Sequence, residues 1–304
     1  MRSLVLLASL AVMTLGCRND GPTAGSPVGL IAYSGRVDLQ RDIWLIGSDG
    51  SGRVNLTNDT IYDGEPSWAP GGHSIAFVRI DPSLGPDIYP MRPDGSNIDR
   101  ITNTPGDWER SPAWSPDGRR IAYNVFESSG FDRVYVMNSN GSGQRELGRG
   151  GPPQWAPDGV HIAYSGPAHG SWSGIILLNV DTGEESVITP YDTTVYGDPA
   201  WSPDGDRIAY AHRRLTPNSH HRLMTMNASG SDPVVVLEAA GILRTPAWSP
   251  DGSQLAFMST MNASEQIYTI QADGTGLRQL TFGDSEMPAL TGSSTPVWQP
   301  VPPP

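Results

Sequence analysis

The sequence predicts an all-β fold, a six-bladed β-propeller of four-stranded antiparallel blades, and three observations support it. A tryptophan in a proline-containing motif recurs six times, at spacings of 41 to 50 residues. A repeat of this length built from short strands is typical of a propeller blade. The 35 glycines and 28 prolines favour frequent turns over long helices. The six tryptophans are Trp68, Trp114, Trp155, Trp201, Trp248 and Trp298.

Residues 1–16 resemble a bacterial lipoprotein signal peptide. One arginine precedes an apolar run from Leu4 to Leu15, which is shorter than the roughly 20 residues of a membrane-spanning helix. Cys17 is the only cysteine, so no internal disulfide can form. In such signals the chain is cleaved before the cysteine and its thiol is lipidated. The alternative is a plain signal peptide with an incidental cysteine.

Residues 17–29 predict a flexible tether, because they are rich in glycine, proline and small polar residues. The lipid on Cys17 would then hold the following domain, residues 30–300, at a membrane. We therefore expect an exported lipoprotein of a bacterial cell envelope, on the periplasmic side or at the outer membrane.

Each repeat contains four strand patterns. The first is a short "PAW"-type run, and the third is an "IYVMN"-type run. The second is an "IAY"-type run that opens at Ile31, Ile75, Ile121, Ile162, Ile208 and Leu255. The fourth is brief and ends near Leu56, Ile101, Leu147, Ile188, Leu237 and Leu280.

The turns between these strands explain the recurring Ser-Pro-Asp-Gly motif. Proline suits the second position of a type I turn, and glycine suits a positive φ. Asp-Gly and Asn-Gly hairpins are expected between the third and fourth strands, as in "SDGSG" and "SNGSG". A residue present in most blades is not the single centre of one active site. The motif is therefore structural, with the tryptophans filling the wedges between blades.

The first strand pattern in the predicted domain, at Leu30, is of the second type, and the last, at Thr295, is of the first type. These two parts make one complete blade. We therefore expect the strand at Trp298 to pair with the strands that open the domain. Such pairing closes the ring and leaves no free sheet edge.

Three segments carry a family resemblance: "WSPDGRRIAY" at Trp114, "WSPDGDRIAY" at Trp201 and "WSPDGSQLAF" at Trp248. They resemble the TolB-like, WD40-like β-propeller repeat, and the resemblance extends from Leu30 to Trp298. It implies a six-bladed propeller and a binding role, since in periplasmic TolB the propeller binds a peptidoglycan-associated lipoprotein. TolB has an α/β domain ahead of its propeller, whereas here the propeller follows the tether directly.

Composition excludes several function classes. The net charge of −12 argues against nucleic acid as a partner. All 20 basic residues are arginine, which excludes Schiff-base lysines, pyridoxal phosphate chemistry and Walker-type phosphate loops. No Gly-x-Ser-x-Gly elbow occurs. We therefore predict neither a catalytic residue nor a cofactor.

The expected binding site is the end of the ring with diverse loops. The turns between strands one and two, and between strands three and four, are uniform and form the turn face. The loops between strands two and three and between blades vary, and they form the variable-loop face. We expect a protein, peptide or glycan ligand at its channel mouth. The predicted binding residues are Tyr62, Asp63, Glu65, Trp108, Arg110, Tyr196, Asp198 and Arg244.

The alternative function is a metal-dependent polysaccharide lyase or hydrolase. Its metal ligands would be His212, His220 and His221, which cluster around one loop. Some polysaccharide lyases on related propellers use a histidine-bound metal. A metal site requires three or four ligands that converge on one point.

Overall fold

The computed structural model describes residues 29–37, 40–104, 106–127, 132–168, 171–190, 192, 194–214, 220–282 and 295–301. The predicted signal peptide, nearly all of the tether and Cys17 lie outside these residues. Regular structure in the described part consists of strands, and no helix there could span a membrane.

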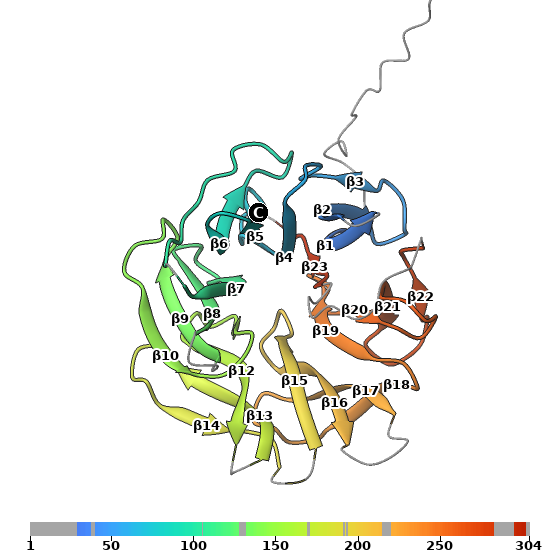
Figure 1. Ribbon diagram of the computed structural model, residues 1–304. Helices are drawn as coiled ribbons and strands as arrows, with labels where there is room; N and C mark the ends of the chain where they lie inside the picture. Colours follow the sequence, from blue (N-terminus) through green and yellow to red (C-terminus); the bar gives the residue numbers. More distant parts are fainter. Residues whose placement is uncertain are drawn as a thin grey trace, which may run out of the picture.

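Six antiparallel sheets are arranged around a central opening (Figure 1). The sheet that closes the ring has the order β23-β1-β2-β3. Its strands are β1 (Leu30–Val37), β2 (Gln40–Gly47), β3 (Val54–Asn55) and β23 (Val297–Trp298). The second and third sheets contain β4 (Tyr62–Trp68), β5 (Ile75–Asp81), β6 (Gly85–Met91), β7 (Trp108–Trp114), β8 (Arg120–Phe126), β9 (Asp132–Asn138) and β10 (Arg145–Arg149).

The other three sheets follow the same order. The fourth contains β11 (Gln154–Trp155), β12 (His161–Ala168), β13 (Ser171–Asn179) and β14 (Glu185–Val187). The fifth contains β15 (Thr194–Trp201), β16 (Arg207–Arg214), β17 (His221–Asn227) and β18 (Val234–Ala239). The sixth contains β19 (Leu243–Trp248), β20 (Gln254–Ser259), β21 (Gln266–Gln271) and β22 (Arg278–Gln279). The predicted fold class is confirmed.

Ring closure joins the two most distant described parts of the chain. Trp298 pairs with Ile31, and Val297 pairs with Ala32. The backbone N–H of Gln299 also donates to the carbonyl oxygen of Leu30 at 2.8 Å. The predicted pairing of the last strand with the opening strands is therefore confirmed, and it removes a free sheet edge.

The second blade has three assigned strands. A fourth segment still runs beside β6, because the Ile101 N–H donates to the Ile88 carbonyl oxygen at 3.0 Å. The Asp99 N–H similarly donates to the carbonyl oxygen of Pro90 at 3.2 Å. Pro90 has no N–H to return, so the ladder at this edge stays incomplete.

The Ser-Pro-Asp-Gly turns behave as predicted. The Gly118 N–H donates to the Ser115 carbonyl oxygen at 2.9 Å, and the φ of Gly118 is +69°. The Asp117 carboxylate accepts hydrogen bonds from the Ser115 hydroxyl and the Arg119 N–H. These bonds lower the pKa of Asp117. Equivalent bonds occur in the turns at Asp204 and Asp251.

The hydrophobic core lies between neighbouring blades. In one cluster, Ala163 and Ile175 of the fourth blade pack against Ile208 and Met224 of the fifth. The motif tryptophans belong to these clusters or flank them. The indole N–H of Trp248 reaches back to the Ala200 carbonyl oxygen of the preceding blade, at 3.2 Å. The tryptophans therefore help to fix the angle between blades, as predicted.

Glycine is required where a hairpin of one blade meets the fourth strand of the blade before it. Gly141 has a φ of +85°, and the Ile101 carbonyl oxygen lies where its side chain would begin. Gly230 meets the Ile188 carbonyl oxygen in the same way. Any side chain at these positions would push two blades apart.

We expect Gly141→Ala to destabilise the protein more than Gly183→Ala. Both glycines have a left-handed backbone, with φ of +85° and +76°, so each substitution adds about 1–2 kcal/mol of strain. The new methyl group collides with the Ile101 carbonyl only at Gly141, because the space beside Gly183 is open. Urea unfolding should show a further loss of at least about 1 kcal/mol for Gly141→Ala. Equal losses would contradict the proposed role of this contact.

Candidate functional site

A cavity of about 280 Å³ lies at the centre of the ring and is lined by the first strand of every blade. Its walls combine prolines and tryptophans of the repeated motif with a few polar residues. The prolines and tryptophans give it an apolar surface, and the polar groups can orient a ligand. The polar lining residues outside the turns include Glu65, Ser67, Ser111, Gln154, Asp198, Thr245 and Thr295.

Four of the inner strands contain a β-bulge just before the motif proline. Strand pairing shifts between Gly64 and Ser67 in β4, and at the equivalent place in β7, β15 and β19. A left-handed backbone costs a non-glycine residue about 1–2 kcal/mol, so other bonds must stabilise these positions. The left-handed residues, with φ between 49° and 55°, are Glu65, Ser111, Asp198 and Thr245.

The amide of each left-handed residue binds a side chain of the preceding blade. The Glu65 N–H donates to Ser34 Oγ at 2.9 Å. Glu65 Oε2 accepts from the Ser111 N–H at 2.6 Å and from the Ser111 hydroxyl at 3.0 Å. The Glu65 carboxylate therefore holds the bulge of the next blade in place.

The same arrangement occurs on the other half of the ring. The Asp198 N–H donates to Ser165 Oγ at 3.2 Å, and Asp198 Oδ2 accepts from the Thr245 N–H at 3.2 Å. Burial raises the pKa of Asp198, and the Arg244 charge and the Thr245 N–H oppose this shift. The first three blades and the last three thus repeat one pattern of polar contacts.

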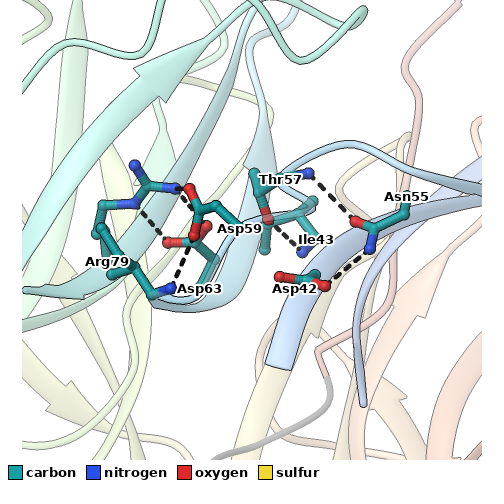
Figure 2. A network of polar contacts seen from close by, with 8 residues as sticks. Asp42, Ile43, Asn55, Thr57, Asp59, Asp63 and Arg79 are labelled. Atoms are coloured by element: carbon teal, nitrogen blue, oxygen red, sulfur yellow. Dashed lines mark hydrogen bonds and ion pairs between the residues drawn. The ribbon is translucent and has the colours of Figure 1, made fainter. Parts of the chain in front are cut away.

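Asp63 belongs to a buried network near the mouth (Figure 2). Its side chain is fully buried, and Arg79 binds both carboxylate oxygens at 2.7 and 2.6 Å. Arg79 also pairs with Asp59 at 2.7 Å. These bonds raise the pKa of Arg79, led by the hydrogen bond to Asp63. Breaking such a pair leaves an uncompensated buried charge, so Asp63 has a structural role in this network.

The same close-up shows hydrogen bonds that join two segments of the first blade beside this ion pair (Figure 2). Thr57 Oγ1 accepts a hydrogen bond from the Ile43 N–H at 3.0 Å, and Asn55 binds Asp42 at 2.7 Å. The Ile88 N–H donates to Thr102 in the same way, and the Ile267 N–H to Thr281. A threonine that follows the fourth strand or segment therefore accepts a hydrogen bond from an amide of the third strand in several blades.

The other predicted residues differ in exposure. Trp108 is 47% exposed, contacts Phe126 at 6.4 Å between ring centroids, and lies 5.7 Å from the Arg110 guanidinium. Arg244 is exposed, and Tyr62 is partly buried beneath the Arg41 guanidinium. Tyr196 is buried, and its hydroxyl donates to Asp192 at 2.9 Å. Of the eight predicted residues, Glu65 and Asp198 line the cavity.

Glu109 is a buried acid that the sequence analysis did not select. It pairs with Val125 on the face of the third blade that packs against the second. Burial raises its pKa to about 7, and neither of its carboxylate oxygens has a hydrogen-bond partner within the described residues. Successive residues of a strand point to opposite faces of the sheet, so Glu109 points away from the face that carries Trp108 and Arg110. This alternation could have indicated from the sequence that Glu109 is buried.

The three histidines lie at separate places. His212 pairs with Arg222, whereas His221 pairs with Arg213, so the two rings project from opposite faces of one sheet. His220 Nδ1 lies 3.0 Å from Glu238 Oε1. Within the described residues, no group of three or more His, Cys, Asp or Glu side chains could hold a metal ion.

A closed ring of six antiparallel sheets around a central cavity defines a six-bladed β-propeller. Residues 151–296 match the family model described as the TolB beta propeller domain, and the propeller is TolB-like. No curated protein matches the chain in sequence.

Solved structures share the fold. TolB from Acinetobacter baumannii has a TM-score of 0.76 at 20% identity, over 90% of this chain and 67% of that chain. A putative TolB from Agrobacterium tumefaciens has a TM-score of 0.67 at 18% identity, over 83% of this chain and 88% of that chain. A chain of a nidogen/laminin complex has a TM-score of 0.66 at 11% identity, over 89% of this chain and 98% of that chain. At these identities the likeness shows the fold alone.

We expect Glu109→Gln to stabilise the protein above pH 7 and to have little effect below pH 4. Between these values the folded state keeps a proton on Glu109 that the unfolded state loses, so the wild-type stability falls as pH rises. A pKa change from 4.5 to about 7 corresponds to roughly 3 kcal/mol. Urea unfolding across this pH range measures it, with exposed Glu184→Gln as control. A difference that does not vary with pH would contradict the raised pKa.

Proposed function

We propose that this protein is a non-enzymatic binding scaffold of a bacterial cell envelope, anchored through a lipid on Cys17. It recognises a protein, peptide or glycan through the variable-loop face and the channel mouth. The observation that carries the proposal is the chemical difference between the two faces of the ring. One face uses its carboxylates to stabilise its own turns, while the other exposes large aromatic side chains beside arginine.

Several carboxylates of the turn face are bonded within their own turns. Asp49 accepts hydrogen bonds from the backbone and hydroxyl of Ser51, and Asp94 does the same for Ser96. These bonds lower the pKa of both carboxyls. Groups already bonded within a turn have less to offer a partner.

The variable-loop face exposes large apolar side chains next to arginine. Trp108 and Phe126 are 47% and 38% exposed, and Leu84 on the neighbouring blade is 51% exposed. Tryptophan and arginine are the residues that most often dominate binding energy at protein interfaces. This combination favours a macromolecular ligand over a small metabolite.

The family match supports a binding role, since residues 151–296 match the TolB beta propeller domain model. A propeller of the same fold also occurs in the nidogen/laminin complex. The metal-dependent enzyme is not proposed, because His212 and His221 project from opposite faces of one sheet.

Photo-cross-linking from both faces tests the binding proposal. A photoreactive phenylalanine analogue at Trp108 or Phe126 should give cross-linked adducts in the native cell, because both side chains are exposed beside the mouth. The same analogue at Arg119 or Asp94, exposed on the turn face, is the matched control. Adducts that form only from the control positions would reject the assignment of the face.

Cys17→Ser tests the anchor. The wild-type protein should fractionate with membranes and incorporate labelled palmitate, because the thiol carries the lipid. The variant should lose the label and move to the soluble fraction. If it stays with the membranes and the wild type carries no label, the lipoprotein assignment is wrong.

A further inference from the structure

The arginines of the variable-loop face differ in how their charge is neutralised. Several form ion pairs, as Arg79 does with Asp63, and Arg222 does with Glu238 at 2.6 Å. Other arginines form no ion pair with a carboxylate within the described residues, and some of these lie at strand ends on the variable-loop face. They include Arg110, Arg213 and Arg244.

Two acids of the inner strands next to these arginines make hydrogen bonds to the backbone of the next blade. Glu65 holds the Ser111 amide and hydroxyl, and Asp198 holds the Thr245 amide. Both carboxylates therefore stabilise left-handed backbone through hydrogen bonds. The Arg244 charge also acts on Asp198 and opposes the rise in its pKa. Arg110 is instead positioned by the Trp108 ring, 5.7 Å from the ring centroid.

Arg110 and Arg244 occupy the same position in their repeats, directly before the left-handed residue of the first strand. Their strands, β7 and β19, belong to blades three apart and lie across the central opening from each other (Figure 1). The two guanidinium groups are thus equivalent anchor points on opposite sides of the mouth.

Arg213 adds to the positive charge near Arg244. It pairs with His221 across β16 and β17, on the face that packs against the sixth blade. Burial lowers the pKa of His221, and the charges of Arg213 and Arg244 lower it further. Unpaired positive charge concentrated at the mouth contrasts with the net charge of −12 for the whole chain.

We infer that the channel mouth binds an acidic polypeptide segment, with carboxylates held by Arg110 on one side and by Arg244 and Arg213 on the other. Guanidinium groups bind carboxylates through paired, charge-assisted hydrogen bonds. The exposed Trp108 and Phe126 rings beside Arg110 favour a peptide, whose apolar side chains can pack there. This inference rests on the proposed function, because it names the ligand of the same site.

Fluorescence anisotropy with a labelled peptide of eight glutamates tests the inference. The peptide should bind the full propeller, and its affinity should fall as salt is added. Arg110→Gln and Arg244→Gln should each weaken binding by at least about tenfold, and the double variant should abolish it. Arg92→Gln and Arg119→Gln are matched controls, since both arginines are exposed on the turn face and form no ion pair within the described residues.

Three results would overturn the inference. Octaglutamate could fail to bind at low salt, the turn-face variants could weaken it as much as the mouth variants, or polygalacturonate could bind through the same arginines while octaglutamate does not. The last result would make the ligand an anionic glycan. Thermal unfolding of each variant confirms that it folds. If octaglutamate fails while cross-linking from Trp108 succeeds, the acidic-peptide inference falls and the binding scaffold stands.

Discussion

The antiparallel pairing of β23 with β1 is the contact on which the rest of the ring depends. Ile31 with Trp298 and Ala32 with Val297 make a short ladder, yet it joins the two ends of a ring of six sheets. Each blade buries its apolar residues against its neighbours, so an opened ring would expose two sheet faces and an edge. This constraint explains why the wedge tryptophans and the hairpin glycines recur from blade to blade.

The closed ring also determines which polar groups of the inner strands are already hydrogen-bonded at the mouth. The inner strands bulge before their prolines, and left-handed residues there expose amides that need partners. Glu65 and Asp198 satisfy the amides of Ser111 and Thr245, and so bind one blade to the next. These acids make their hydrogen bonds to the backbone, and we propose that the arginines of the mouth bind a ligand. The strained left-handed residues and the proposed binding site therefore belong to the same inner strands.

Two buried acids near the mouth differ in whether a positively charged side chain binds the carboxylate. Burial raises the pKa of Asp63 to about 6, and the two hydrogen bonds from Arg79 limit that rise. Glu109 has no such partner, and burial raises its pKa to about 7, so it holds a proton under mildly acidic conditions. Neither acid is available as a surface contact, although both belong to strands that lead into the mouth.

The sequence by itself determined the six blades, the turn positions and the closing strand, because turn chemistry and strand alternation are local and repeat six times. Only the tertiary structure decided which residues of the mouth are exposed. Phe126 and Trp108 lie on the face of the third blade toward the fourth, whose first strand, β11, is two residues long. Asp63, which is one of the predicted residues, and Glu109, which lies between the predicted Trp108 and Arg110, are both buried. Burial depends on how far the adjacent blade reaches, and no local pattern records that distance.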